Sequence, residues 1–355
     1  MKNILIYIFD YLSYIHSGSC LQGNNIQEVV KHSMSEAVKI VKKWDDGTTE
    51  FKLSGGGIEV TVYSLGGIIQ SIKVPNKDGE LADVVLGYDT PQEYGAQYIG
   101  GIIGRYSNRV ANGKFTLDGK QHQLNINHGP NYVHGGLVGF DQKPWEYEVS
   151  GSKLILTYTS VDGEENFPGT LKAKVTYEVT DDAMIIVDYS AVTDKPTIVS
   201  LSNHAFFNLQ GHNKGDISNH VVKLNSSEYT PLDGTKIPYG HVESVEGKDA
   251  DMRQGKLLTQ ELLNSDDYDT LDGFDRNYII EGRQGCKNYV GRVSADGRIL
   301  DMYTTHPSLH FYTGYALSVP KGQGWCYLRQ PQFPQAVLRP GEVYSDTTWF
   351  QFLME

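Results

Sequence analysis

The sequence predicts an all-β fold, a large β-sandwich with few short helices. From about residue 48 onward, short runs that alternate polar with apolar residues are separated by Gly, Asp and Asn. This alternation is typical of half-buried strands joined by tight turns. Hardly any stretch has the 3.6-residue apolar period of a helix, and the chain contains 38 glycines. Both features predict sheets rather than helices as the main elements.

The first 33 residues are predicted to be a leader or a dispensable N-terminal extension. Residues 1–20, MKNILIYIFDYLSYIHSGSC, have a basic start, an apolar stretch and small residues near the end, as a secretory signal has. Asp10 interrupts the apolar stretch, which is too short for a transmembrane helix. Met34 is an alternative start. Because no linker-like segment follows residue 48, we expect a single domain over residues 34–355.

Two hairpins give the strongest strand signals. Residues 114–124, KFTLDGKQHQL, place Asp118 and Gly119 between two β-rich runs, and both positions of such a turn need positive φ. The runs 172–179 and 183–192 predict a second hairpin. Further strands are predicted, in chain order, at 57–64, 67–74, 153–159, 197–202, 220–225, 277–281, 299–304 and 310–316, and helices only at 91–96 and 256–264.

The composition of the chain excludes some classes of binding partner. The formal net charge is −12, the pI is near 5.4, and there is no dense run of Lys or Arg, which argues against nucleic acid or an anionic membrane as a partner. Three cysteines, Cys20, Cys286 and Cys326, are an odd number without CxxC spacing and suggest neither a disulfide framework nor a zinc site. We therefore expect a reduced, cytoplasmic protein, or a secreted one if residues 1–20 act as a signal.

Several familiar sites are missing from the sequence. It has no GxxxxGK[ST], no GxGxxG behind a strand, no HExxH and no GxSxG, so nucleotide, zinc-protease and serine-hydrolase sites lack their minimal parts. Some of the eleven histidines are evenly spaced, but glycines interrupt both evenly spaced sets, and no metal site is predicted.

Polar side chains instead gather beside aromatic residues in four segments. These are GRYSNRVANGKF (104–115), NHGPNYVHGG (127–136), LSNHAFFNLQG (201–211) and LDGFDRNY (271–278). A sugar pocket needs this mixture, because hydroxyls require hydrogen-bond partners while the CH face of the ring packs on aromatic surface. Each segment alone is also compatible with a turn or a capped strand end, and His204 alone with a hydrogen-bonded core histidine.

Together and in this order, the segments resemble the aldose 1-epimerase (galactose mutarotase) family from about residue 48 to the C-terminus. The motifs that carry the resemblance are Asn108-Arg109, His134 in NYVHGG, DGEENFPG (162–169), SNHAFFNL, YTPLDGTKIPYG (229–240), GFDRNY, FYTG (311–314) and VLRPGEVY (337–344). The resemblance implies the galactose mutarotase-like supersandwich, a reaction without a cofactor, and a monosaccharide such as galactose or glucose as substrate. We also expect a monomer or weak dimer.

The resemblance also implies roles for individual residues. His204 is expected to be the general acid at ring O5, with His134 binding nearby and sharing charge. Asn108, Arg109 and Asp275 are expected to hold ring hydroxyls. His310 stands where the family commonly has a glutamine, and it is expected to adjoin the pocket and to bind substrate. Arg276, where a histidine often follows the aspartate, is a second departure that we expect at the pocket.

The largest difference from the family's sequence pattern concerns the catalytic base. The family's base is a glutamate in a pattern close to C-L-E-T-Q, but here Cys326 is followed by Tyr327-Leu328-Arg329. A stretch is deleted, and three explanations remain open. The sequence reflects a faulty gene model or splice form; the protein is a catalytically impaired carbohydrate-binding homologue; or another carboxylate, Glu164 or Glu165, serves as the base.

Overall fold

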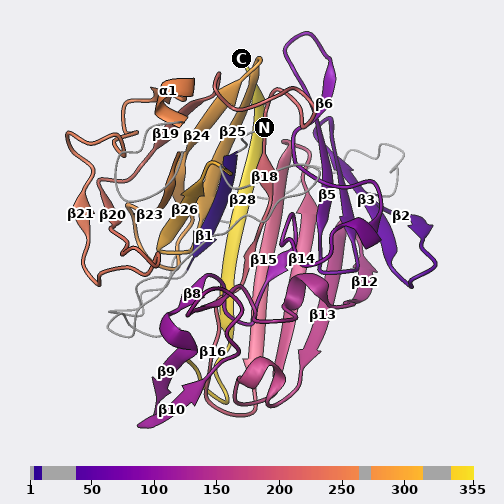
Figure 1. Cartoon of the computed structure of the whole chain (residues 1–355). Coiled ribbons are helices and arrows are strands. Elements are labelled where there is room, and N and C mark those ends of the chain that lie inside the picture. The colour runs from indigo at the N-terminus through magenta and orange to yellow at the C-terminus, as the bar shows by residue number, and fades with distance from the viewer. Residues whose placement is uncertain (1–3, 10–36, 264–272, 315–336) are drawn as a thin grey trace.

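A computed structural model describes residues 4–9, 37–263, 273–314 and 337–355. Antiparallel strands in three large sheets and four two-stranded pairs are the main regular elements of these residues (Figure 1). Helical structure in the described part of the chain is limited to one α-helix and four short 3-10 turns: α1 (Gln260–Leu263), η1 (Pro91–Glu93), η2 (Ala111–Gly113), η3 (Phe140–Gln142) and η4 (Glu164–Asn166). The all-β sandwich with few short helices is confirmed.

The largest sheet has nine strands and runs through the middle of the molecule in Figure 1. Its order is β12 (Glu146–Ser150), β13 (Lys153–Ser160), β14 (Leu171–Val179), β15 (Met184–Thr193), β28 (Tyr344–Met354), β25 (Arg298–Thr304), β24 (Asn288–Ala295), β19 (Val221–Leu224) and β22 (Lys256–Leu257). The last strand of the chain therefore sits at its centre, between β15 and β25. Buried and less buried residues alternate along β28, as in a strand with two different faces.

Two further large sheets accompany the nine-stranded sheet. The five-stranded sheet has the order β2 (Val38–Lys43), β3 (Thr49–Gly55), β4 (Ile58–Tyr63), β5 (Ile69–Pro75) and β6 (Leu81–Asp83). The six-stranded sheet has the order β18 (Phe206–Phe207), β1 (Ile4–Phe9), β26 (Ser308–Tyr312), β23 (Asp275–Ile279), β20 (Glu228–Thr230) and β21 (Glu243–Ser244).

Four short pairs join distant segments of the chain. They are β7 (Ile102–Ile103) with β17 (Ser202–Asn203), β8 (Arg109–Val110) with β11 (Tyr132–Val133), β9 (Lys114–Leu117) with β10 (Lys120–Gln123), and β16 (Thr197–Ile198) with β27 (Val337–Leu338). The first two pairs carry or precede the site residues described below.

One continuous hydrophobic core contains residues of all three large sheets. Val60 of the five-stranded sheet, Val175 and Leu300 of the nine-stranded sheet, and Leu309 and Phe311 of the six-stranded sheet belong to the same buried cluster. Burying such side chains stabilises the fold by roughly 1.5–3 kcal/mol each. A shared core holds the three sheets together.

Both predicted hairpins are confirmed, as β9–β10 and β14–β15. At the first turn Asp118 and Gly119 have φ of 50° and 76°. The helix predictions are largely wrong, because residues 256–257 pair as strand β22 and only α1 is helical, while 91–96 contains only the 3-10 turn η1. The run 197–202 divides between β16 and the start of β17.

The N-terminal strand β1 comes from the segment predicted to be a leader or extension. Its backbone pairs antiparallel with β26, Leu5 opposite Tyr312 and Tyr7 opposite His310, and with β18 on its other edge. Figure 1 shows this indigo strand beside the later orange strands. Whether residues 1–33 are cleaved or dispensable stays a prediction. Throughout the described ranges, helices are too short and too polar to cross a membrane.

Candidate functional site

The pair β8–β11 places the first three site residues. Asn108 has φ of 65° and His134 has φ of 48°, and asparagine and histidine are among the residues that best tolerate this left-handed backbone. The Asn108 backbone N–H donates to His134 Nδ1 at 3.0 Å, and the His134 N–H donates to the Asn108 carbonyl at 3.2 Å. Because Nδ1 accepts this bond, neutral His134 carries its proton on Nε2.

Arg109 follows Asn108 on β8, opposite Val133 of β11. Its side chain is fully buried, and one terminal nitrogen contacts the ring of His128. A buried guanidinium needs partners that accept its hydrogen bonds or carry negative charge. Arg109 therefore places a buried positive charge beside His128.

His204 lies directly after β17, and backbone bonds tie it to the 100–101 turn. Its N–H donates to the Gly101 carbonyl at 2.9 Å, and its carbonyl accepts from Gly100 at 2.8 Å. Its ring is 3% exposed and meets the ring of His134 edge to face, with 5.1 Å between centroids. The structure thus brings together the two histidines that were predicted as catalytic.

Asp275 and His310 complete the group of predicted site residues from the six-stranded sheet. On β23 and β26, Asp275 pairs with Tyr312 and Asn277 with His310, so Asp275 and His310 are diagonal neighbours on one face. His310 Nε2 lies 2.8 Å from Asp275 Oδ1, and neither side chain is exposed. The two residues form a buried imidazole–carboxylate pair.

Burial sets the charge state of these groups. It lowers the pKa of His134 well below the usual value, and the charges of Arg109, His310 and His128 lower it further. Burial also lowers the pKa of His204, with His310 contributing, although a backbone hydrogen bond opposes the shift. Both imidazoles are therefore neutral near pH 7.

Asp275 is shifted toward its charged form. Burial raises its pKa, but the hydrogen bond and charge of His310, with the charges of Lys236 and Arg109, outweigh burial and lower the pKa overall. The same interactions show that His310, Lys236 and Arg109 each act electrostatically on Asp275. The carboxylate is ionised near pH 7.

Three site residues were not named as candidates from the sequence. Tyr98 lies against both catalytic candidates, its ring centroid 5.1 Å from His134 and 5.8 Å from His204. His128 contacts Arg109, and burial together with that charge lowers its pKa to about 3. Lys236 is 8% exposed and acts on Asp275. His128 and Lys236 lie inside quoted motifs, whereas nothing around Tyr98 distinguishes it from other tyrosines.

Arg276 does not share the face of Asp275. Alternation along β23 places it with Tyr278 on the opposite side, and its guanidinium lies over the Tyr229 ring, 5.2 Å from the centroid. Arg276 thus lies on the face of β23 opposite to Asp275, because successive strand residues point to opposite faces of a sheet. Whether Arg276 adjoins the pocket stays a prediction.

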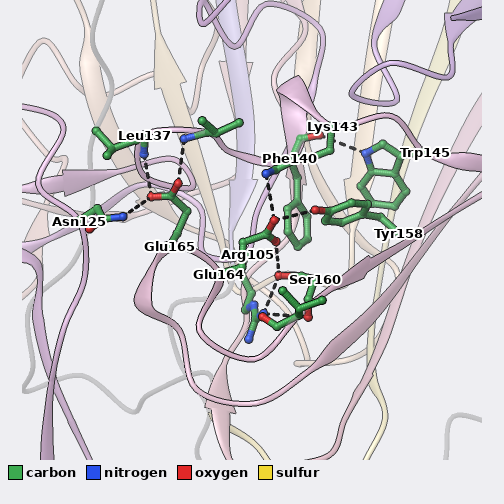
Figure 2. Close-up of polar contacts among 12 residues, drawn as sticks. Arg105, Asn125, Leu137, Phe140, Lys143, Trp145, Tyr158, Ser160, Glu164 and Glu165 are labelled. Atoms are coloured by element: carbon green, nitrogen blue, oxygen red, sulfur yellow. Dashed lines mark hydrogen bonds and ion pairs between the residues drawn. The ribbon is translucent and has the colours of Figure 1, made fainter. Parts of the chain in front are cut away.

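Glu164, one of the two proposed replacement bases, is held by structural contacts (Figure 2). Its carboxylate accepts bonds from Tyr158 Oη at 2.7 Å and Ser160 Oγ at 2.5 Å, and pairs with Lys143 Nζ at 2.9 Å. Burial raises its pKa, but these three donors outweigh burial and lower the pKa. Glu164 is thus engaged with the β13 strand and Lys143.

Glu165 binds the loop that follows His134. Its carboxylate accepts from the backbone N–H of Leu137 at 2.9 Å and from Asn125 Nδ2 at 2.8 Å (Figure 2). It also accepts from the backbone N–H of Val138 at 3.1 Å. These contacts stabilise the path of the chain immediately after His134. They give Glu165 a positioning role rather than contact with His204 or His310.

The segment around Cys326, where a deletion is predicted, lies outside the described residues. Among the residues that are described, no group of three or more His, Cys, Asp or Glu side chains is arranged to hold a metal ion. The arrangement brings together imidazoles that exchange protons and charged groups that bind hydroxyls, which suits acid–base chemistry on a polar ligand.

Comparison with known proteins agrees with this geometry. The aldose 1-epimerase family model matches residues 50–351. The human galactose mutarotase is 39% identical over 329 residues, covering 86% of this chain and 94% of its own. The aldose 1-epimerase of Escherichia coli K12 is 35% identical over 326 residues, covering 85% and 94%.

Solved structures give the same result. A GalM/aldose epimerase homologue from C. elegans superposes with a TM-score of 0.77 at 27% identity, covering 86% of this chain and 99% of its own. The galactose 1-epimerase of Lactobacillus acidophilus NCFM has a TM-score of 0.75 at 25% identity, covering 89% and 98%.

Proposed function

Because the chain belongs to the aldose 1-epimerase family, we propose that it interconverts the α and β anomers of an aldohexose such as galactose or glucose. The reaction opens the hemiacetal. The O1 proton leaves, ring O5 gains a proton, and C1 becomes an aldehyde that rotates before the ring closes on its other face. One acid and one base suffice for both directions.

His204 is the proposed acid at O5. Its imidazolium form donates the proton. Because burial lowers the pKa of His204, this form is a stronger acid, but a smaller fraction of the protein carries it. His134 lies beside it with Nε2–H available as a donor, because Nδ1 accepts from Asn108. We assign His134 to binding the sugar next to the reacting oxygen.

Charged and amide groups are proposed to hold the ring hydroxyls. Arg109 and ionised Asp275 offer charge-assisted hydrogen bonds, which are stronger than neutral ones. Asn108 and His310 adjoin them. The preferred epimer depends on which hydroxyl each of these groups meets.

One observation carries the proposal: the His134 and His204 rings, from segments 70 residues apart, meet at 5.1 Å inside the protein. A core histidine with a purely structural role does not need a second imidazole against it. The Arg109 and Asp275 charges around the pair support a polar ligand over an apolar core contact.

The test is mutarotation of freshly dissolved α-D-galactose by the full chain, followed by polarimetry against the spontaneous rate. We expect acceleration that falls by about 10²–10⁴-fold in His204→Ala. A folded wild-type protein without acceleration would contradict the proposal.

A second candidate is a carbohydrate-binding homologue with impaired catalysis. The specific observation in its favour is the deletion after Cys326, which removes the segment where the family's base is expected. Loss of one member of an acid–base pair slows turnover while the hydroxyl-binding groups stay in place. Calorimetry with galactose distinguishes this candidate, because it predicts binding without accelerated mutarotation.

The proposal also covers the ligand class, the location and the oligomeric state of the protein. The net charge of −12 favours a small polar ligand over nucleic acid or an anionic membrane. We propose a cytoplasmic monomer or weak dimer, or a secreted protein if residues 1–20 act as a signal. Fractionation of the native cells and sedimentation of the purified chain test these two points.

A further inference from the structure

Tyr98 lies against both of the imidazoles that the proposed function uses. Its ring centroid is 5.1 Å from that of His134 and 5.8 Å from that of His204, and the two imidazoles also contact each other. His134 and His204 are 1% and 3% exposed, whereas Tyr98 is partly exposed. Solvent, and with it a ligand that arrives from solvent, therefore reaches Tyr98 more readily than either imidazole.

We propose that Tyr98 is a further substrate-binding residue: its ring packs against the sugar beside His134 and His204, and its hydroxyl hydrogen-bonds one of the sugar's non-anomeric hydroxyls. This inference rests on the proposed function and deepens it, because it adds a contact to the same site. A phenol suits such a ligand, since its apolar body packs on the CH face of a sugar ring while the polar tip pairs with a hydroxyl.

The backbone of Tyr98 has an unusual conformation. Its φ of 64° lies in the left-handed region, which bulky residues rarely adopt and which concentrates at ligand sites. The Gly101 N–H donates to the Tyr98 carbonyl at 3.1 Å and closes the turn. Gly100 and Gly101 of this turn are the residues that exchange backbone bonds with His204. One turn thus positions both Tyr98 and His204.

The hydroxyl of Tyr98 is only weakly engaged. Asn127 Nδ2 lies 3.4 Å from Tyr98 Oη, which is long for a hydrogen bond. The two hydrogens of this amide have better acceptors in the carbonyls of Val133 at 2.9 Å and Gly136 at 2.7 Å. As the acceptor in its contact with Asn127, the Tyr98 hydroxyl keeps its own proton for another partner.

The phenol retains this proton near neutral pH. Burial raises the pKa of Tyr98 well above its usual value, and the charge of Asp141 raises it further, while Arg109 and the bond from Asn127 oppose the shift. Tyr98 is therefore a neutral hydrogen-bond donor near pH 7. A neutral O–H that donates to a sugar oxygen contributes to binding and not to proton transfer.

Two substitutions separate the ring from the hydroxyl. Tyr98→Phe keeps the ring and loses the hydroxyl, and Tyr98→Leu loses both. In the full chain, we expect Tyr98→Phe to weaken galactose binding in calorimetry about 3–10-fold, the effect of one neutral hydrogen bond, and to raise KM similarly with kcat little changed. Tyr98→Leu should bind more weakly still. Unchanged affinity in Tyr98→Phe overturns the hydroxyl contact, and equal affinity of the two variants overturns the ring contact.

Deoxy sugars distinguish a direct contact with the sugar from an indirect effect on the fold. The wild type and Tyr98→Phe should bind equally well to the deoxy sugar that lacks the contacted hydroxyl, because the partner of Tyr98 Oη is then missing for both proteins. The probes are 2-deoxy-, 3-deoxy-, 4-deoxy- and 6-deoxy-D-galactose. If Tyr98→Phe weakens binding of every probe to the same extent, the hydroxyl contact is overturned.

Tyr289→Phe is a matched control. Tyr289 is also partly exposed, and its hydroxyl makes a similarly long bond of 3.3 Å to Asp301 Oδ1. Its ring packs against Tyr303 of the nine-stranded sheet rather than against a histidine. We expect this variant to bind galactose like the wild type and to unfold at a similar temperature. A loss of affinity as large as that of Tyr98→Phe would overturn the assignment, because the loss would then not be specific to Tyr98.

The proposed function and the Tyr98 assignment fail in different ways. A folded wild-type protein that neither binds galactose nor accelerates mutarotation overturns both. A wild-type protein that binds galactose, together with a Tyr98→Phe variant that binds it equally well, overturns the Tyr98 assignment alone.

Discussion

The imidazole rings of His134 and His204 meet at an interplanar angle of 81°. One bond from the Asn108 N–H holds the His134 ring, and a second joins the His134 N–H to the Asn108 carbonyl. Two backbone bonds tie His204 to the 100–101 turn. The backbones of both residues are therefore anchored, and their buried rings lie in contact.

From this contact we predict non-additive losses. His134→Ala and His204→Ala should each reduce kcat/KM by about 10²–10⁴-fold, and the double variant should lose less than the product of the two, because residues that act as a unit are not independent. Polarimetry of the four proteins measures this. Losses that multiply fully would mean that the two histidines act separately.

A second prediction concerns the loop after His134. Glu165→Gln replaces one carboxylate oxygen with an N–H₂ group that cannot accept from the Leu137 or Val138 N–H. We expect kcat to fall by roughly 10-fold to 10²-fold, because a displacement of about 1 Å of a catalytic group has that effect. Glu148→Gln, at an exposed position of β12, is the control and should leave kcat unchanged. Equal activity in both variants would remove Glu165 from any positioning role.

A third prediction follows from Asp141, a buried carboxyl in the turn η3. Burial raises its pKa from 3.8 to about 7, although its own backbone, Lys143 and Gln142 oppose the shift. Between these two values the folded state holds a proton that the unfolded state has released. Stability therefore falls as pH rises across this window and is constant above it.

Asp141→Asn removes the ionisable carboxyl and should therefore remove the loss of stability at high pH. At 1.36 kcal/mol per pKa unit, we expect the variant to gain on the order of 2 kcal/mol more at pH 8 than at pH 5 relative to wild type. Urea unfolding at both pH values measures the difference, with Asp45→Asn at an exposed turn as the control. A gain that does not depend on pH would contradict the burial of an ionisable carboxyl at this position.

The fourth prediction concerns β1. Because β1 pairs with β26 on one edge and β18 on the other, deleting residues 1–9 removes backbone partners from both strands. Each buried backbone group left unsatisfied costs about 1–3 kcal/mol, so unfolding should begin at a distinctly lower urea concentration. Deletion of residues 1–3 alone, which keeps β1, is the control. An unchanged unfolding midpoint in the longer deletion would show that the sheet does not need this strand.

Local patterns accounted for the fold class and both hairpins. Asp118-Gly119 and the alternating runs 172–179 and 183–192 fold as expected, because a tight turn and a two-residue period depend only on neighbouring residues. The strands β2, β3, β12, β24 and β28 were not predicted. Two-residue strands such as β8 and β11 exist only through their partner and leave no periodic signal of their own.

The sequence by itself determined the all-β class and the family resemblance, and it predicted six site residues, since these depend on residue type and order. Tertiary structure decided what the sequence does not encode locally. It placed Asp275 against His310, separated Arg276 from them on the other face, and engaged Glu164 and Glu165 elsewhere. The physical reason is that contact and burial arise from strand pairing between distant segments, and burial then sets the pKa of each histidine and carboxylate.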